Sequence, residues 1–197
     1  MAPPIELLEP AEDHPKAAPG DLNHVRRFVN TLDLEDGSDS IGSPDELRAW
    51  LAERELVDAA TELSAGDVRQ AQAFREALRK LLLANNGDPL DADAVDAVNE
   101  ASKRAELQVR VNAEGEAALV PVRTGVEGAI GRLLAIVFRA QADGTWARLK
   151  ACALHDSCEW AFYDWSKNRS GTWCDMAVCG NRAKARAYRE RRRGRPG

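Results

Sequence analysis

The clustering of all four cysteines within 28 positions constrains the fold of this chain more than any other feature of its sequence. They form two pairs, Cys152 with Cys158 and Cys174 with Cys179, and fifteen residues separate the pairs. Zinc accepts four thiolates in a tetrahedral arrangement, and two short loops that each present two sulfurs enclose it without leaving a position for water. The pattern therefore predicts one structural zinc site with these four residues as ligands.

Other interpretations of these cysteines stay open at this point. The spacings within the pairs, five and four residues, are wider than in the tight C-x2-C knuckle, so buried cysteines without a metal are an alternative. His155 lies between the first two cysteines and could replace one as a ligand, or act as a base beside a free thiol. Four sulfurs already complete the zinc sphere, which favours an exposed loop histidine.

The charge of the chain changes sign near Gly144. Residues 1–144 carry a net charge of −12 and residues 145–197 a net charge of +7, although the whole chain carries only −5. Most of the positive charge follows Cys179, in a run rich in helix-forming residues. An acidic body with a basic C-terminal helix indicates a polyanionic partner, and a solvated basic tail is the alternative. Four arginines would share one face of that helix: Arg182, Arg186, Arg189 and Arg193.

Residues 21–144 have the periodicity of an α-rich domain. Four stretches with apolar residues at helical spacing come first, and Ser43 and Glu46 match the capping box that starts a helix. Alternating residues within 107–122 then predict two paired strands, before helical spacing returns. We expect a mainly α protein with one small β-hairpin, whose helical N-terminal domain is followed by a small zinc module at residues 145–197.

Smaller features complete the expected organisation. Residues 1–20 are rich in proline and lack apolar periodicity, so we expect a flexible arm. No stretch approaches the roughly 18 apolar residues of a membrane span, and the first residues lack the pattern of a signal peptide, so we expect a cytoplasmic protein. Gly125, Gly128 and Gly131 have the wrong spacing for a phosphate-binding loop and fit close helix packing instead.

Motifs around the second cysteine pair resemble the CGNR zinc finger. Asp164-x-Ser-Lys-Asn-Arg-Ser170 precedes the pair, and Trp173-Cys-Asp-Met-x-x-Cys-Gly-Asn-Arg182 contains it, with Lys184 close behind. Lys167 stands where arginine is expected, which weakens phosphate contact from that loop because lysine lacks the bidentate fork of arginine. The resemblance implies zinc ligation by the same four cysteines, in a finger similar to a treble clef with a basic C-terminal helix.

The front of the chain is similar to the ABATE domain, which accompanies this finger in bacterial stress-induced transcription regulators. The similarity lies in Phe28-Val-Asn-Thr-Leu32, the helix that begins at Pro44 and the stretch Phe74-Arg-Glu-Ala-Leu-Arg79. From finger and helix together we expect a zinc-dependent transcription regulator that binds double-stranded DNA near the nucleoid. We expect the phosphate or base contacts from Arg182, Lys184, Arg186 and Arg189, with secondary contacts from Asn168, Arg169 and Asn181. Asn181 could instead cap the helix.

The N-terminal domain is expected to sense a small-molecule effector or to mediate assembly, and a homodimer would suit paired half-sites on DNA. Arg26, Arg27 and Asn30 on its first helix could line an anion pocket, although exposed surface charges are the commoner arrangement. Its acidity could also mask the basic tail until a signal separates them.

Three other functions compete with DNA binding. The same basic helix and aromatic residues suit RNA. A zinc module that binds an acidic protein is the second alternative. The third is an enzyme that uses Cys174 or His155, which requires a cysteine free of metal. We expect a regulator and not an enzyme.

Overall fold

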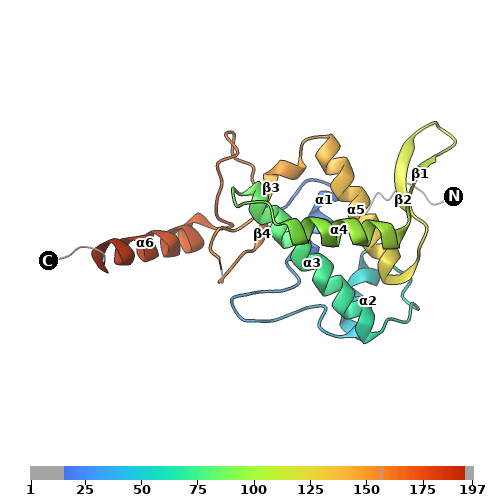
Figure 1. The fold of residues 1–197 in the computed structure, drawn as a ribbon, viewed down its shortest axis with the longest axis horizontal. Helices are drawn as coiled ribbons and strands as arrows, with labels where there is room; N and C mark the ends of the chain where they lie inside the picture. Colours follow the sequence, from blue (N-terminus) through green and yellow to red (C-terminus); the bar gives the residue numbers. More distant parts are fainter. Residues whose placement is uncertain (1–15, 156, 194–197) are drawn as a thin grey trace.

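The computed structural model describes residues 16–155 and 157–193. None of the helices in these residues is long and apolar enough to cross a membrane. The elements follow one another in the order α1 (Leu22–Val29), α2 (Pro44–Glu53), α3 (Ala65–Asn85), α4 (Ala92–Ala105), β1 (Leu107–Val111), β2 (Ala117–Pro121), α5 (Gly125–Ala142), η1 (Trp146–Arg148), β3 (Leu149–Ala151), β4 (Ala161–Tyr163), η2 (Met176–Gly180) and α6 (Asn181–Arg193) (Figure 1).

Side-chain caps start two of the central helices. The Ser43 hydroxyl accepts a hydrogen bond from the Glu46 amide at 3.3 Å, which confirms the predicted start of α2. Ser64 forms a full capping box at the start of α3, because its hydroxyl accepts from the Asp67 amide and the Asp67 carboxylate accepts from the Ser64 amide at 2.7 Å. The sequence pattern did not single out this second cap.

The helices enclose one main core. Phe28 of α1, Leu78 of α3 and Leu133 of α5 are buried in it, and α4 covers α3 and α5. Strands β1 and β2 form the predicted antiparallel hairpin, with Leu107 opposite Pro121. This hairpin projects from the end of the body that lies away from α6 (Figure 1).

Glycines allow α5 to approach its neighbours closely. A Cβ atom on Gly131 would lie 2.7 Å from Cβ of Pro121 and 2.9 Å from Cβ of Ala105. A Cβ atom on Gly128 would lie 2.4 Å from the carbonyl oxygen of Arg123. These distances are too short for a side chain, so the packing interpretation holds for Gly128 and Gly131. It does not hold for Gly125, whose Cβ position is open and whose φ of 61° lies in the left-handed region that favours glycine.

A second antiparallel pair, β3 with β4, joins the helical body to the cysteine-bearing segment. Leu149 and Ala151 of β3, and Ala161 and Tyr163 of β4, belong to the main core. The sequence predicted one hairpin only, because strands of three residues are too short to show alternation. The segment that carries the cysteines therefore shares this hairpin with the helical body.

Part of the predicted N-terminal arm is folded. Residues 1–15 lie outside the described residues, so the prediction of flexibility is not addressed there. Residues 16–20 pack against the body: Ala18 is buried in the main core, and the carbonyl of Lys16 accepts a hydrogen bond from the Tyr163 amide at 2.9 Å.

Candidate zinc centre and basic helix

The four cysteine sulfurs converge to within 4.8 Å of one another. The Sγ atom of Cys158 lies 3.5 Å from that of Cys174 and 3.7 Å from that of Cys179, and the last two are 3.6 Å apart. A zinc ion with Zn–S bonds of about 2.3 Å separates its sulfurs by about 3.8 Å, whereas a disulfide brings two sulfurs to about 2.05 Å. The cysteines therefore form one zinc-binding site and no disulfide.

The four cysteine side chains differ in their exposure to solvent. Cys152 and Cys179 are buried, and Cys158 and Cys174 are half-buried. Phe162 of β4 packs with them in a small second core, while its neighbour Tyr163 faces the main core. Successive side chains of β4 thus pack into different cores. The aromatic residues between the cysteine pairs are therefore divided between the main core and the second core.

The four thiols of the cluster differ in their pKa. Hydrogen bonds from Cys158 and Cys174 lower the pKa of the Cys152 thiol to about 2. The bond to Cys152 raises the pKa of Cys158 to about 12 and also raises that of Cys174, and burial raises the pKa of Cys179. A bound zinc ion would release the protons of these thiols, because only thiolates ligate zinc.

Backbone hydrogen bonds shape the loop of the first cysteine pair. The Cys152 amide donates to the carbonyl of Trp160 at 3.0 Å, and the Cys158 amide donates to the carbonyl of Leu154 at 3.1 Å. These bonds turn the chain so that both sulfurs face the same point.

His155, within this loop, does not belong to the sulfur cluster. Its side chain is 43% exposed, with Nε2 3.7 Å from a carboxylate oxygen of Asp88 and Nδ1 3.5 Å from one of Glu159. Its position agrees with the interpretation as a loop histidine that faces solvent.

Asp175 shapes the loop of the second cysteine pair. Its side chain accepts hydrogen bonds from the amides of Ala177 at 2.6 Å and Val178 at 3.0 Å. It thereby caps η2, a single π-helical turn that places Cys174 and Cys179 at the same metal position.

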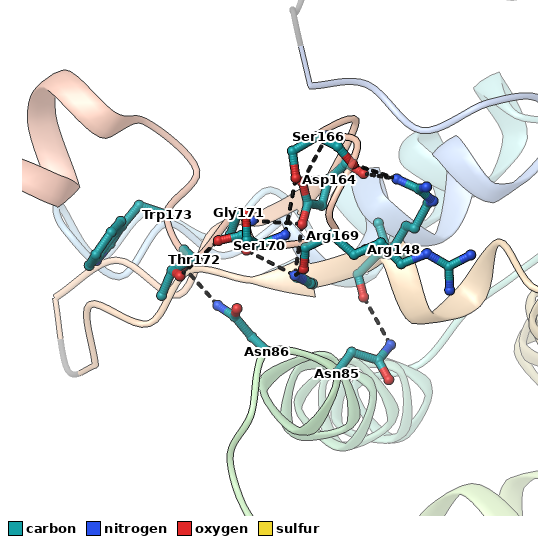
Figure 2. Close-up of polar contacts among 12 residues, drawn as sticks. Asn85, Asn86, Arg148, Asp164, Ser166, Arg169, Ser170, Gly171, Thr172 and Trp173 are labelled. Atoms are coloured by element: carbon teal, nitrogen blue, oxygen red, sulfur yellow. Dashed lines mark hydrogen bonds and ion pairs between the residues drawn. The ribbon is translucent and has the colours of Figure 1, made fainter.

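The loop after β4 closes around the buried carboxylate of Asp164, which Figure 2 shows with its neighbours. The Asp164 carboxylate accepts hydrogen bonds from Lys150 Nζ at 2.8 Å and from the amides of Ser166 and Gly171 at 3.0 and 2.8 Å. Lys150 also donates to the carbonyls of Arg169 and Gly171. Burial raises the pKa of Asp164, but the bonds from Lys150 and the loop outweigh it and lower the pKa to about 2.

Two asparagines at the end of α3 hold the module against the body. Asn85 donates to the carbonyls of Trp146 and Leu149, and Asn86 donates to those of Ala151 and Thr172 at 2.8 Å each (Figure 2). Their partners are 61 to 86 positions away, so no local signal could reveal this role.

Arg79 of α3 makes a further link of this kind. It is 2% exposed, and its guanidinium donates to the carbonyls of Val29 at 2.8 Å and Glu159 at 3.0 Å. Glu76 balances its charge at 3.0 Å. The buried guanidinium of Arg79 therefore links α3 to the end of α1 and to the loop of the first cysteine pair.

The basic helix α6 starts directly after η2 and extends away from the body (Figure 1). Arg182 contacts the body, with a guanidinium nitrogen 2.8 Å from a carboxylate oxygen of Glu35, and this bond raises the pKa of Arg182. Arg189 donates through Nε to the carbonyl of Ala185. The expected contact residues on this helix are all exposed: Arg182, Lys184, Arg186 and Arg189.

The expected secondary contacts lie on two other segments. Asn168 and Arg169 are exposed in the loop after β4, where Arg169 has a left-handed backbone with φ of 53°. Asn181, at the start of α6, donates through Nδ2 to the carbonyl of Ala177 at 2.8 Å. This bond ties the helix to the zinc turn, but it is not the helix cap considered above, in which the side chain would accept a hydrogen bond from a backbone amide.

Comparison with protein families agrees with this geometry. Residues 148–192 match the CGNR zinc finger, a range that includes all four cysteines. Residues 22–158 match ABATE, the family described as "putative stress-induced transcription regulator". The two matches overlap at β3 and the first cysteine pair, where the structure also joins the two parts. No curated protein matches the chain. Because the longer match covers more than half of the sequence, the chain belongs to the ABATE family and carries a CGNR zinc finger.

Proposed function

We propose that this protein is a zinc-dependent, DNA-binding transcription regulator that responds to stress. The observation that carries the proposal is the basic helix α6, whose start is fixed by the zinc turn and which extends from the body (Figure 1). Guanidinium and ammonium groups along such a helix suit the phosphates of a duplex, and a helix fits the major groove. Five exposed basic residues follow the contact at Arg182: Lys184, Arg186, Arg189, Arg191 and Arg192.

The charge of the body favours an orientation in which α6 faces the DNA. Residues 1–144 carry a net charge of −12, so the body is repelled by phosphates while α6 is attracted. The protein would approach a duplex with α6 first and with the acidic body on the far side. Binding should then depend on few residues and strongly on salt.

Zinc is required in this proposal because the module has little other core. Among the described residues, the second core buries Leu154 and Phe162 besides two cysteines, with Trp173 and Ala183 partly buried against them. A core of this size does not stabilise a fold alone, so removal of the metal should release η2 and with it the fixed direction of α6. The cysteines would have a structural role, and we propose no catalytic activity.

A fluorescence-anisotropy titration of the full-length, zinc-loaded protein against random duplex DNA tests the proposal. If α6 contacts about five phosphates, the affinity should fall roughly 10²- to 10³-fold between 50 and 200 mM salt. A chelator should abolish binding. The double variant R186Q/R189Q should weaken binding and reduce the salt dependence, whereas R110Q, an exposed arginine on β1 at the opposite end of the body, should not. Zinc-independent binding, or equal losses in both variants, would refute the proposal.

Trp165 favours RNA as a second candidate ligand. Its ring is 59% exposed, and its Nε1 donates to the carbonyl of Ala17 at 2.9 Å, which fixes its orientation. A fixed, exposed aromatic ring suits stacking with an unpaired base. Structured RNA and single-stranded DNA should therefore compete with the duplex at matched salt. If RNA binds more tightly and W165A removes that preference, the RNA function replaces the DNA function.

A further inference from the structure

The two cysteines that solvent reaches belong to different loops. Cys152 is 0% exposed and Cys179 is 3% exposed. Cys158, from the first pair, and Cys174, from the second pair, are half-buried. The Sγ atoms of these two lie 3.5 Å apart. An oxidant that enters from solvent therefore meets the sulfurs of Cys158 and Cys174 first, and it meets them as neighbours.

We propose that Cys158 and Cys174 are a redox modification site, at which a hydroperoxide converts the two zinc-binding thiolates into a disulfide. The new bond would connect the two cysteine loops and leave Cys152 and Cys179 as the remaining thiolates. Two thiolates do not complete the tetrahedral sphere of a structural zinc site, so the metal would be released.

The reaction balances with hydrogen peroxide as the oxidant. One thiolate attacks the peroxide, so that an S–O bond forms, the O–O bond breaks, and the hydroxide that leaves takes up a proton. The second thiolate attacks the resulting sulfenic acid, so that the S–S bond forms, the S–O bond breaks, and a second hydroxide takes up a proton. The two thiolates together lose two electrons, and the peroxide is reduced to two molecules of water.

Exposure, and not distance, selects this pair. The Sγ atoms of Cys174 and Cys179 are 3.6 Å apart, and those of Cys158 and Cys179 are 3.7 Å apart, so proximity alone would allow other disulfides. Zinc binds all four cysteines as thiolates, so thiolate character does not separate them either. Burial does, because Cys152 and Cys179 lie inside the second core, whereas Cys158 and Cys174 pack against it from partly exposed positions.

The surroundings of the two exposed sulfurs suit this reaction. Arg182 lies close enough to attract the sulfur of Cys158: after the larger effect of Glu35, the sulfurs of Cys179 and Cys158 help to raise the pKa of Arg182. A nearby cation favours the thiolate, which is the form that attacks a peroxide. Asp175, which follows Cys174, is exposed, so this part of the loop lies at the surface of the module.

Loss of zinc would act on α6 through Cys179. The turn η2 ends at Gly180 and α6 begins at Asn181, so Cys179 is the last zinc ligand before the basic helix. The proposed disulfide does not include Cys179, and the second core is too small to fix the turn without metal. Oxidation would thereby release the direction of α6. Control of DNA binding by this step rests on the proposed function, whereas oxidation and zinc release do not.

The test treats the full-length, zinc-loaded protein with no more than an equimolar amount of hydrogen peroxide and then blocks the remaining thiols with N-ethylmaleimide in urea. Trypsin and an aspartate-specific protease place the four cysteines on separate peptides, residues 151–155, 156–163, 170–174 and 175–182. We expect mass spectrometry to find peptides 156–163 and 170–174 joined. A chromogenic chelator should detect released zinc in an amount equal to this disulfide, and a reductant with added zinc should restore the site.

Histidine variants connect the disulfide to the release of zinc. C158H and C174H each replace a half-buried sulfur by another zinc ligand and remove the proposed bond, so peroxide should release zinc at least roughly fivefold more slowly. M176L is the matched control, because Met176 is 50% exposed in η2 and is itself oxidisable. It should release zinc at the wild-type rate. If the histidine variants do not load zinc, the peptide map of the wild type decides.

A predominant disulfide of any other pair, or a Cys158–Cys174 disulfide in protein that keeps its zinc, would overturn the proposal. Slow zinc release in M176L would also overturn it, because the methionine would then be the oxidised group that matters. DNA binding of untreated, oxidised and re-reduced protein is measured separately by anisotropy. If the untreated protein does not bind DNA, the proposed function fails, and the peptide map still decides the oxidation site.

Discussion

Lys150 and Asp164 show how a loop with few apolar residues becomes fixed. Their side chains are 6% and 3% exposed, and together with backbone amides they close residues 164–171. The substitution Asp164→Asn would leave the ammonium of Lys150 buried without its counter-charge. We expect a loss of about 3–5 kcal/mol in the free energy of unfolding, measured with urea at pH 7 on zinc-loaded protein.

The control for this variant is Asp45→Asn. Asp45 also pairs with an arginine, but its side chain is 86% exposed. Its removal should change the free energy of unfolding by less than about 0.5 kcal/mol. If the two variants lose similar stability, the buried pair has no special role in holding the loop.

The lowered pKa of Asp164 predicts a pH dependence. Its pKa is about 2 in the folded protein against an ordinary value of 3.8, so its ionised form favours folding by about 2 kcal/mol. This contribution is present above about pH 4 and is lost as the pH falls towards 2. The difference in urea midpoint between wild type and Asp164→Asn should therefore be constant from pH 7 to 5 and shrink below pH 4. Acid release of zinc affects both proteins and does not produce this difference.

Gly171 is required by the same carboxylate. A Cβ atom at this position would lie 2.7 Å from Oδ1 of Asp164 and 2.9 Å from its Cγ, and the pair with Lys150 prevents the carboxylate from moving away. We expect Gly171→Ala to cost about 1–3 kcal/mol of stability. Gly42→Ala, where the nearest atom would be 3.4 Å away, should cost less, and thermal denaturation of the two variants compares them.

Elements with a local signal were predicted from the sequence, and elements without one were not. The start of α2 at Ser43 and the hairpin of β1 and β2 are each set by residues a few positions apart. The pair of β3 and β4 depends on distant partners, because its side chains fill the main core beside α3. Three-residue strands carry too little alternation to reveal that packing.

The same distinction separates the parts of the candidate site. The four cysteines are all of one residue type and close in sequence, so their pattern alone indicated a metal site. Asp164, Arg79 and Asn86 act through contacts with residues far along the chain. Sequence reasoning saw Asp164 and Arg79 as members of family motifs and had no physical role for them, because that role exists only in the folded chain.

The turn η2 offers a test of how the second pair of ligands is positioned. Asp175→Ala removes the two hydrogen bonds that cap the turn, so Cys174 and Cys179 should hold zinc less firmly, by about 1 kcal/mol or roughly fivefold in affinity. Competition with a chromogenic chelator measures this loss. Asp175→Asn keeps an acceptor oxygen and should retain most of the affinity. An alanine variant with unchanged zinc affinity would show that the cysteines position themselves.

The whole molecule sets a body of charge −12 against a terminal segment of charge +7, and Arg182 of the basic helix forms an ion pair with that body. Glu35, in the connection between α1 and α2, lies 2.8 Å from Arg182 at the start of α6. The hydrogen bond from Arg182 lowers the pKa of Glu35, so the pair stays ionised at neutral pH. Arg182 is one of the residues expected to contact DNA, so under the proposed function the acidic body would compete with DNA for it.

Glu35→Gln should accordingly tighten DNA binding, by about two- to fivefold, because an exposed ion pair is a weak competitor. Asp36→Asn is the matched control. It removes the same charge from the neighbouring position, but Asp36 bonds to Ser38 and not to α6. Both variants make the body less acidic, so any gain shared by the two measures long-range repulsion, and the excess in Glu35→Gln measures the contact. Anisotropy titrations at low salt resolve the two. Weaker binding by Glu35→Gln would mean that Glu35 orients Arg182 for DNA, so that the body assists the helix and does not mask it.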